Sequence, residues 1–412
     1  MSARVSVVTA GHLSTCPRML KAADALHGAG YRVHVVSVNH TPWATAADRL
    51  VASSRRWEWT VVDYDRSTAR VLQFMTGARF RAARAVSAAV GPDRVPISVV
   101  TRAYSRAHDE IVRAVVSRPA DFVYGGTTGA LAAVAEAAAA LHVPYGIDLE
   151  DFHSAEQNGP DSDQVHALAT RVERRVLAGA ARVTAGSPMI GEAYAQKYGV
   201  RPIPIHNTFS LRLPVGPAAP EPHALRLYWF SQTLGPGRGL EEMVHGIGRS
   251  GVRAELHLRA RPIPEYVESL RELQRQVAPT MTIVHHEPAS PDAMVELAQN
   301  YDAGFSCEEP AVLNRRLCLC NKIFTYLAAG VPVILTRTPA QAALSADLGT
   351  AALTYDCGDV DGLGDRLRRF AGDVDARRQA RCAARAAAER RWHWEHPDDR
   401  GALLTAVADG LG

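Results

Sequence analysis

The chain has 412 residues, of which 47% are hydrophobic, and this length predicts two domains rather than one large core. Its formal net charge is only +3, from 46 basic and 43 acidic side chains. This near balance argues against a general nucleic-acid binder, which has a larger or more localised basic excess. No uninterrupted apolar run approaches the roughly 20 residues that a membrane-spanning helix needs.

The first eleven residues predict a short strand followed by a glycine turn. They lack the charged start and the long apolar stretch of a signal peptide. We therefore expect a cytoplasmic protein with six reduced cysteines.

Strand-like and helical segments alternate along the first half of the chain. After the strand-like segment 4–11, apolar side chains recur at helical spacing at Met19, Leu20, Ala23 and Leu26. Further strand-like runs lie at 120–126, 143–148, 181–187 and 201–207, and residues 131–141 form an alanine-rich helical stretch between two of them. The alternation predicts a doubly wound parallel sheet of the α/β class.

The segment 210–223 is dense in proline and has no period, which is typical of a linker. The alternation restarts at residue 224, with helices expected at 265–277, at 292–299 and beyond Asp373. We therefore expect an N-terminal domain of residues 1–209, a linker of residues 210–223 and a second domain of residues 224–391. Residues 392–412 form the C-terminal segment.

A basic segment, residues 55–118, interrupts the first alternation. A helix at 76–90 would place Phe80, Ala83 and Val86 on one face and its arginines elsewhere. This helix is either a solvated basic helix packed on the sheet or a patch for an anionic acceptor or for peripheral membrane contact.

Two stretches of the second half predict phosphate binding. In the first, a strand ending near Ser231 and Gln232 runs into Gly235, Gly237, Arg238 and Gly239, and a helix follows. Helix N-termini present free N–H groups and a positive dipole end, and an arginine adds a bidentate charge.

The second stretch is residues 317–336, where Asn321 and Lys322 begin a helix that Gly330 ends. A lysine in the first turn of a helix is unfavourable unless an anion binds there. Two such helix starts in one domain predict a diphosphate ligand. The spacing of Cys318 and Cys320 does not fit a zinc site, so no metal is expected.

An acidic cluster follows the strand-like run at 143–148. It contains Asp148, Glu150, Asp151, His153 and Glu156, at the strand end where a doubly wound sheet places its site. Neighbouring carboxylates shift one another's pKa values, which suits acid–base chemistry. A solvated acidic loop is the alternative.

Taken in order, these motifs resemble the GT-B glycosyltransferases of the retaining "group 1" class, which includes phosphatidylinositol mannosyltransferases and mycothiol glycosyltransferases. The resemblance rests on Gly11 and Arg18 in the first βα unit, on "YGIDLED", on "SQTLGPGRGLEE", on "NKIFTYLAAGVPVI" and on "WHWEH". It implies two Rossmann-like domains facing across a cleft, with a C-terminal helix that crosses back to the first domain.

The resemblance also implies a nucleoside diphosphate sugar as donor, transfer to an unidentified acceptor, and retention of configuration without a metal. The family's phosphate-binding lysine falls on Arg238, and its preceding arginine on Gln232. A histidine that contacts the donor sugar falls on Glu150, next to Asp151.

Two family glutamates fall on Leu317 and Thr325, and the second normally binds the nucleotide ribose. Glu308 or Glu309 is expected to compensate for its loss. Arg238 and Lys322, with the amides of Cys320 to Lys322, are expected to stabilise the leaving diphosphate.

Two alternatives stay open: a catalytically inactive GT-B scaffold or partner protein, and a nucleotide-sugar epimerase. A nicotinamide dehydrogenase is disfavoured, because residues 9–17 contain one glycine where the dinucleotide fingerprint has three.

Overall fold

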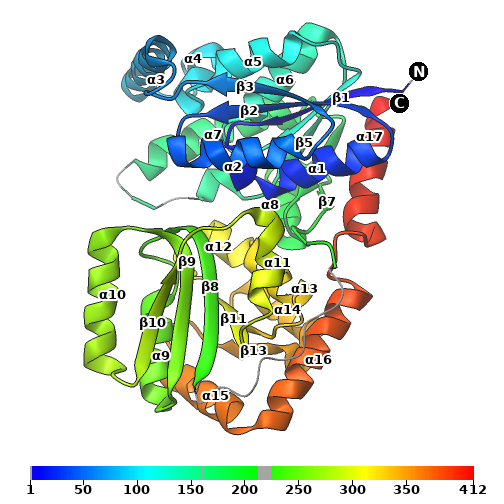
Figure 1. Cartoon of the computed structure of the whole chain (residues 1–412). Coiled ribbons are helices and arrows are strands. Elements are labelled where there is room, and N and C mark those ends of the chain that lie inside the picture. Colours follow the sequence, from blue (N-terminus) through cyan, green and yellow to red (C-terminus); the bar gives the residue numbers. More distant parts are fainter. Residues whose placement is uncertain (1, 157, 160, 212–223) are drawn as a thin grey trace. The chain divides into compact units, whose positions relative to one another are not determined.

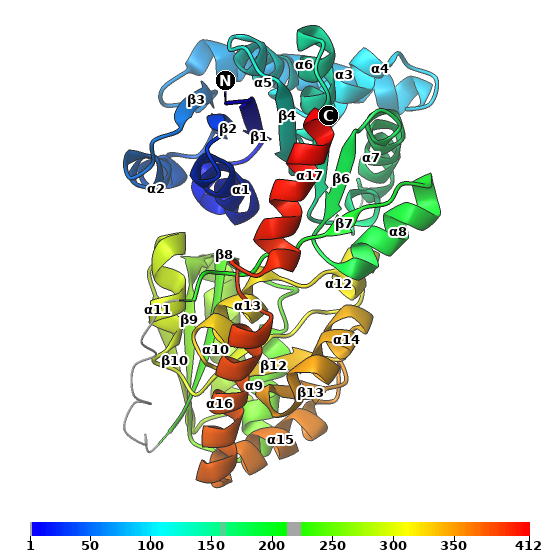
Figure 2. The same ribbon diagram turned by 90° about the vertical axis from the view of Figure 1, so that its right-hand side faces the viewer.

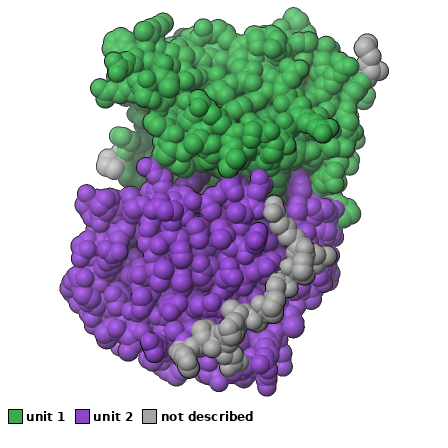
Figure 3. All heavy atoms as spheres, in the orientation of Figure 1, with its two compact units in different colours: residues 1–206, 397–412 green, residues 207–396 purple. Residues whose placement is uncertain are grey.

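The computed structural model describes residues 2–156, 158–159, 161–211 and 224–412. It divides into two units, which Figure 3 colours separately. Unit 1 comprises Met1–His206 and Pro397–Gly412, and unit 2 comprises Asn207–His396. Most of the expected linker, residues 212–223, lies outside the described residues.

Unit 1 contains a parallel sheet with the strand order β3-β2-β1-β4-β5-β6-β7 in the described residues (Figure 1). The strands are β1 (Arg4–Thr9), β2 (Arg32–Asn39), β3 (Glu58–Asp63), β4 (Phe122–Gly126), β5 (Tyr145–Leu149), β6 (Arg182–Ala185) and β7 (Ile203–Pro204). β1 lies at the centre of the sheet, with Val7 beside Val35 on one side and Tyr124 on the other. β1 and β4 are buried on both faces, as expected for strands that helices cover on both sides.

Helices cover both faces of this sheet (Figures 1 and 2). They are α1 (Pro17–Gly28), α2 (Pro42–Ser53), α3 (Arg70–Val90), α4 (Ile97–Tyr104), α5 (His108–Val116), α6 (Leu131–Leu141), α7 (Ser162–Leu177), α8 (Pro188–Tyr198) and α17 (Ala402–Leu411). α17 packs on β4, β5 and β6, and a π-helical turn at Pro397–Gly401 leads into it. In that turn, the buried Asp399 carboxylate accepts the backbone N–H of His206 at 2.8 Å.

Unit 2 repeats the topology, with the strand order β10-β9-β8-β11-β12-β13. The strands are β8 (Leu225–Leu234), β9 (Ala254–Pro262), β10 (Met281–His286), β11 (Ala303–Ser306), β12 (Val333–Thr336) and β13 (Ala352–Tyr355). The helices are α9 (Leu240–Ser250), α10 (Pro264–Val277), α11 (Met294–Ala298), α12 (Leu313–Leu317), α13 (Asn321–Ala328), α14 (Pro339–Leu348), α15 (Val360–Gly372) and α16 (Val374–Arg390). A core between the sheet and α9, α10 and α15 buries Trp229, Met243 and Phe305 among others.

Both sheets are therefore doubly wound and parallel, as the sequence predicts. Some segments differ from expectation. The strand expected at 201–207 pairs only at Ile203–Pro204, because prolines at 202 and 204 remove ladder donors. The helix expected at 292–299 is a 3₁₀ turn, Pro291–Ala293, followed by the short α11.

The basic segment 55–118 does not interrupt the sheet, contrary to expectation, because it contains β3, which pairs with β2 along its whole length. Within it, α3 buries Thr76, Ala83 and Ser87, whereas Val86 is exposed. Of the apolar face expected here, Ala83 is therefore buried and Phe80 half-buried, and only Val86 lies outside the buried side of the helix.

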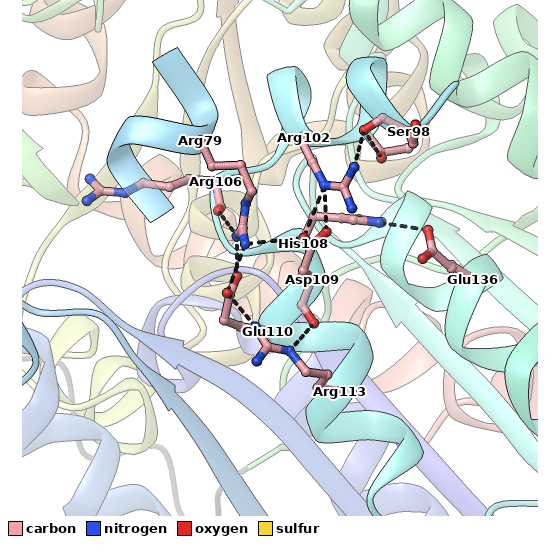
Figure 4. Close-up of polar contacts among 10 residues, drawn as sticks. Arg79, Ser98, Arg102, Arg106, His108, Asp109, Glu110, Arg113 and Glu136 are labelled. Carbon is pink, nitrogen blue, oxygen red and sulfur yellow. Dashed lines mark hydrogen bonds and ion pairs between the residues drawn. The ribbon is translucent and has the colours of Figure 1, made fainter. Parts of the chain in front are cut away.

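The arginines of this segment are partly neutralised by acidic residues of α5 (Figure 4). Arg79 on α3 forms ion pairs with Asp109 and Glu110, at 3.2 and 2.5 Å. Glu110 also pairs with Arg113, at 2.7 Å. The 76–90 helix thus carries fewer free cations than its sequence suggests. None of the described helices has both the length and the apolar character that crossing a membrane would require.

Candidate functional site

The candidate site of unit 2 lies where the strand order reverses. β8 and β11 are adjacent strands whose following helices leave in different directions, and ligands of open α/β sheets bind beyond the carboxyl ends of such strands. The loop after β8 leads to α9, and the loop after β11 leads through α12 to α13.

The loop after β8 depends on two glycines in the left-handed region. Gly237 and Gly239 have φ values of 70° and 69°, which residues with a Cβ rarely adopt. A Cβ on Gly239 would also lie 2.5 Å from the Cβ and the carbonyl oxygen of Cys307, just beyond β11. The two site loops therefore approach one another only because residue 239 is glycine.

Arg238 lies between these glycines and is half-buried. Among the described residues it forms no hydrogen bond or ion pair, and its charge helps to lower the pKa of Glu308. Arg238 is thus a cation near the start of α9 without an ion-pair partner in the part of the chain that the structure describes.

Lys322 is the second residue of α13, whose N-cap is Cys320. Its side chain is 6% exposed, and Nζ lies 3.7 Å from Glu308 Oε1 and 5.9 Å from the centroid of the Trp229 ring. Burial acts to lower the pKa of Lys322, but Cys320 and Glu308 outweigh it and raise that pKa. Lys322 is therefore a charged ammonium group at a helix N-terminus.

Glu308 is the central carboxylate of this site and is 5% exposed. Thr336 Oγ1, at the end of β12, lies 2.9 Å from both the backbone N and the backbone O of Glu308. Burial acts to raise the pKa of Glu308, but Lys322, Arg315 and Arg238 hold it below its ordinary value. Three cations thus surround one carboxylate, which leaves a positive excess.

Arg315, on α12, is the cation that sequence reasoning missed. Its Nη1 donates to the carbonyl oxygen of Gly237 and lies 3.4 Å from Glu308 Oε2. It therefore ties the glycine loop to the Glu308 loop. The only signal in the sequence is the pair Arg315 and Arg316 just before the 317–336 stretch.

The remaining residues predicted from the 317–336 stretch differ in burial and in hydrogen bonding. Cys320 Sγ lies 2.7 Å from Ser306 Oγ and 3.4 Å from Glu308 Oε1, and burial raises its pKa. Asn321, the first residue of α13, is half-buried. Thr325 is fully buried, and its hydroxyl donates to the carbonyl oxygen of Asn321 at 3.1 Å. Thr325 therefore does not present its hydroxyl to a ligand.

Three other predicted ligand-binding residues lie at the margin of this site. Ser231 and Gln232 belong to β8, next to an irregularity in its pairing with β9, and Gln232 is exposed. Glu309 is half-buried and, together with burial and Glu241, raises the pKa of Tyr266. The carboxylate of Glu309 therefore affects Tyr266 of α10, whereas the carboxylate of Glu308 pairs with the cations of the site.

In unit 1, Glu150 and Asp151 directly follow β5, and both are partly buried. Burial and the neighbouring Asp151 raise the pKa of Glu150 to about 7. A carboxyl group with that pKa can accept or release a proton at neutral pH.

Arg18 and Gly11 were predicted to bind ligand, and in the structure Arg18 has partners within the protein. Arg18 is buried, its Nε donates to Asp148 Oδ2 at 2.7 Å, and Nη1 donates to the carbonyl oxygen of Ile205 at 2.6 Å. It thereby ties α1 to the end of β5. Gly11 follows β1, and its carbonyl oxygen accepts a hydrogen bond from the backbone N–H of Val38 at 3.2 Å. It is a candidate ligand-binding residue by its position alone.

His153 is a further candidate that the sequence reading named only as part of the acidic cluster. It is 2% exposed, and its Nδ1 lies 3.0 Å from Glu156 Oε2. Burial acts to lower its pKa, but Glu156 outweighs burial and raises that pKa to about 9. Nε2 is buried without a hydrogen-bond partner among the described residues.

Comparison with solved structures identifies the fold. HepE (Alr3699) from Anabaena, solved in complex with UDP, matches with a TM-score of 0.64 and 15% identity, over 100% of this chain and 99% of that chain. Its complex with UDP-glucose matches with a TM-score of 0.65 and 15% identity, over 99% of both chains. A glycosyltransferase from Rickettsia africae matches with a TM-score of 0.68 and 12% identity, over 99% of this chain and 98% of that chain.

The chain has the GT-B fold. No protein-family model matches the chain, and no curated protein matches it by sequence.

Within the GT-B fold, the predicted residues form two groups, one in each unit. Unit 2 brings together Arg238, Glu308, Cys320 and Lys322, and adds Arg315. Unit 1 brings Glu150 and Asp151 together at the end of β5. Arg18 and Thr325 are occupied by contacts within the protein.

Proposed function

We propose that this protein is a glycosyltransferase that moves a sugar from a nucleoside diphosphate donor to an acceptor hydroxyl group. The observation that carries the proposal is the excess of cations around Glu308, at the starts of two helices of unit 2. A diphosphate supplies the negative charge that this arrangement lacks. HepE, which shares the fold across nearly the whole chain, has been solved with UDP and with UDP-glucose, so a UDP-sugar is the first donor to test.

The chemistry follows from the leaving group. Breaking the bond between the anomeric carbon and the diphosphate oxygen builds negative charge on the diphosphate. Lys322, which Glu308 holds, and the first amides of α13 are fixed before the reaction, so they stabilise that charge without reorganising. Arg238 adds a second positive charge near the start of α9. In our proposal these two cations act in place of a metal ion.

On the acceptor side, the hydroxyl oxygen forms the new bond to the anomeric carbon and loses its proton. Glu150 accepts this proton in our proposal, because its pKa of about 7 leaves much of it ionised at neutral pH. The resemblance to the group 1 class implies retention of configuration at the anomeric carbon.

The first test is nucleotide binding. Thermal unfolding of the purified protein is measured with UDP, GDP and dTDP and with their sugars. A nucleotide present at about 100 times its Kd stabilises the folded state by about 2.7 kcal/mol. We expect a shift of this size with UDP, and its absence with all three nucleotides would contradict the proposal.

The second test is catalysis by Arg238→Gln, measured as donor hydrolysis or as transfer. Loss of one cation that stabilises the leaving diphosphate should lower kcat by about 100- to 1000-fold. Arg271→Gln, on the exposed face of α10, is the control that removes the same charge away from the site. Activity of Arg238→Gln within about twofold of wild type would exclude the assigned role, and interconversion of donor sugars without acceptor would favour the epimerase.

A further inference from the structure

A cavity of about 780 Å³ lies within unit 1, beyond the carboxyl ends of β2 and β3. Its volume is in the range of sites that bind small molecules. The lining residues that matter here are His40, Tyr64, Asp65, Arg66, Arg70 and Arg106. The proposed chemistry in unit 2 makes no use of this cavity.

The cavity lining carries more positive than negative charge. Arg66 and Arg70 are exposed, and neither forms an ion pair or a hydrogen bond among the described residues. Asp65 is the carboxylate of the lining, and its Oδ1 accepts the backbone N–H of Ser67 at 2.7 Å. The two arginine side chains are therefore available to donate hydrogen bonds to a ligand.

Arg106 is the third arginine, and it is held in place. Its Nε donates to Thr76 Oγ1 at 3.1 Å, and Nη2 donates to the carbonyl oxygen of Gln73. The guanidinium lies 5.3 Å from the centroid of the Tyr64 ring. Figure 4 shows the Arg106 side chain pointing away from the ion pairs of Arg79 and Glu110. Nη1 has no hydrogen-bond partner among the described residues, so it can donate to a ligand.

The aromatic lining of the cavity is also fixed by contacts within the protein. The rings of His40 and Tyr64 stack with their centroids 5.5 Å apart. The backbone N–H groups of His40 and Thr41 lie 3.3 and 3.2 Å from His12 Nε2, which accepts from them, so the ring proton is on Nδ1. Nδ1 donates to Asp48 at 2.8 Å. The aromatic wall is thus positioned before a ligand binds.

We propose that this cavity binds an anionic group, a phosphate or a carboxylate, carried by the acceptor of the transfer reaction. The arginine fork matches both anions in geometry and charge. The assignment to an acceptor rests on the proposed function, because it needs a second substrate in unit 1. β5 lies three strand spacings from β2 and four from β3, so the strand ends beside the cavity are about 14–19 Å from the end of β5, where Glu150 lies. The acceptor therefore carries its anionic group well away from the reacting hydroxyl.

The test measures the affinity of the whole protein for inorganic phosphate by calorimetry. Arg70→Gln should weaken phosphate binding about tenfold, the effect of losing one charge-assisted hydrogen bond. Arg81→Gln is the matched control, because Arg81 is also exposed on α3 and has no partner among the described residues, yet does not line the cavity. Equal effects of the two substitutions, or no measurable phosphate binding by wild type, would overturn the proposal.

A third variant separates this proposal from the proposed function. Arg238→Gln should leave phosphate binding to the cavity unchanged while it weakens UDP binding. Loss of phosphate binding in Arg238→Gln together with normal binding in Arg70→Gln would place the anion in unit 2, which overturns the cavity proposal and leaves the proposed function intact. If UDP does not bind but phosphate binding depends on Arg70, the proposed function fails and the anion site stands.

The source of the anion is decided by competition with inorganic phosphate. The soluble arm compares a hexose phosphate with the matching free hexose. The lipid arm uses vesicles of phosphatidylcholine with and without phosphatidic acid, because Val71 and Phe74, at the start of α3, are 74% and 67% exposed. Competition by the hexose phosphate indicates a soluble acceptor, and competition by phosphatidic acid vesicles indicates a lipid head group. Competition by neither means that only the free ion binds, which overturns the acceptor assignment.

Discussion

Lys322 Nζ lies 3.7 Å from Glu308 Oε1, and both side chains are more than nine-tenths buried. A buried carboxylate therefore holds the ammonium group at the start of α13, where the helix dipole would otherwise oppose it. Arg238 has no such partner among the described residues. The candidate diphosphate site thus combines one cation that is held in place with one that is open to a ligand.

Glu308→Gln should destabilise the protein by about 3 kcal/mol at neutral pH, because it leaves Lys322 buried without its carboxylate. The pKa of Glu308 is lowered in the folded state, so its contribution is present above the ordinary glutamate pKa and is lost as the pH falls through the lowered value. Urea unfolding across this pH range measures the difference. Glu309→Gln, one residue away, is the control, and an equally large effect there would argue against the special role of Glu308.

Glu150→Gln should stabilise the protein by about 1–3 kcal/mol above pH 7. The pKa of Glu150 is raised to about 7, so the folded state favours its protonated form, and that advantage is lost as the pH rises from the ordinary glutamate value through 7. The substitution should have little effect at low pH. Unfolding free energies at both ends of the range, with the exposed Glu192→Gln as control, test this prediction.

The same residue predicts a pH dependence of transfer. If Glu150 accepts the acceptor proton, kcat/KM should rise with pH around a midpoint of about 7, because only the ionised carboxylate is a base. Glu150→Gln should lose this rise along with most of the activity. A variant whose pH profile keeps the same midpoint would show that another group titrates.

Arg18→Met should destabilise the protein by about 3–5 kcal/mol, because Asp148 would remain buried without its charge partner. Thr184 Oγ1 and Tyr124 OH also contact Asp148, at 2.6 and 3.3 Å, and they lessen this cost. Nucleotide affinity, measured under conditions where the variant is folded, should equal that of wild type. A large loss of affinity without loss of stability would restore the ligand role predicted from the sequence.

Thr325→Val should leave the Kd for UDP within about twofold of wild type. The Thr325 hydroxyl is fully buried and bonded to the Asn321 carbonyl, so it is not available to a ribose. Calorimetric titration with UDP measures the effect, and Glu309→Ala is compared in the same experiment. A tenfold weaker Kd in Thr325→Val would show that this position contacts the nucleotide after all.

The amino-acid sequence by itself determined the periodic features of this protein. The alternation of strand and helix patterns, the glycines around Arg238 and the helix that starts at Asn321 depend on local backbone preferences, which residues near in the chain decide. For that reason the doubly wound sheets and the two helix starts of unit 2 could be predicted.

The tertiary structure alone decided which charges are free. Arg18, Glu308 and Thr325 look like candidates in the sequence, but their partners come from distant elements or from a specific helical geometry. Arg315 was missed for the same reason, since its contact with Gly237 joins residues 78 positions apart. Burial and pairing of a charge depend on what the fold brings next to it, and local sequence carries little information about that.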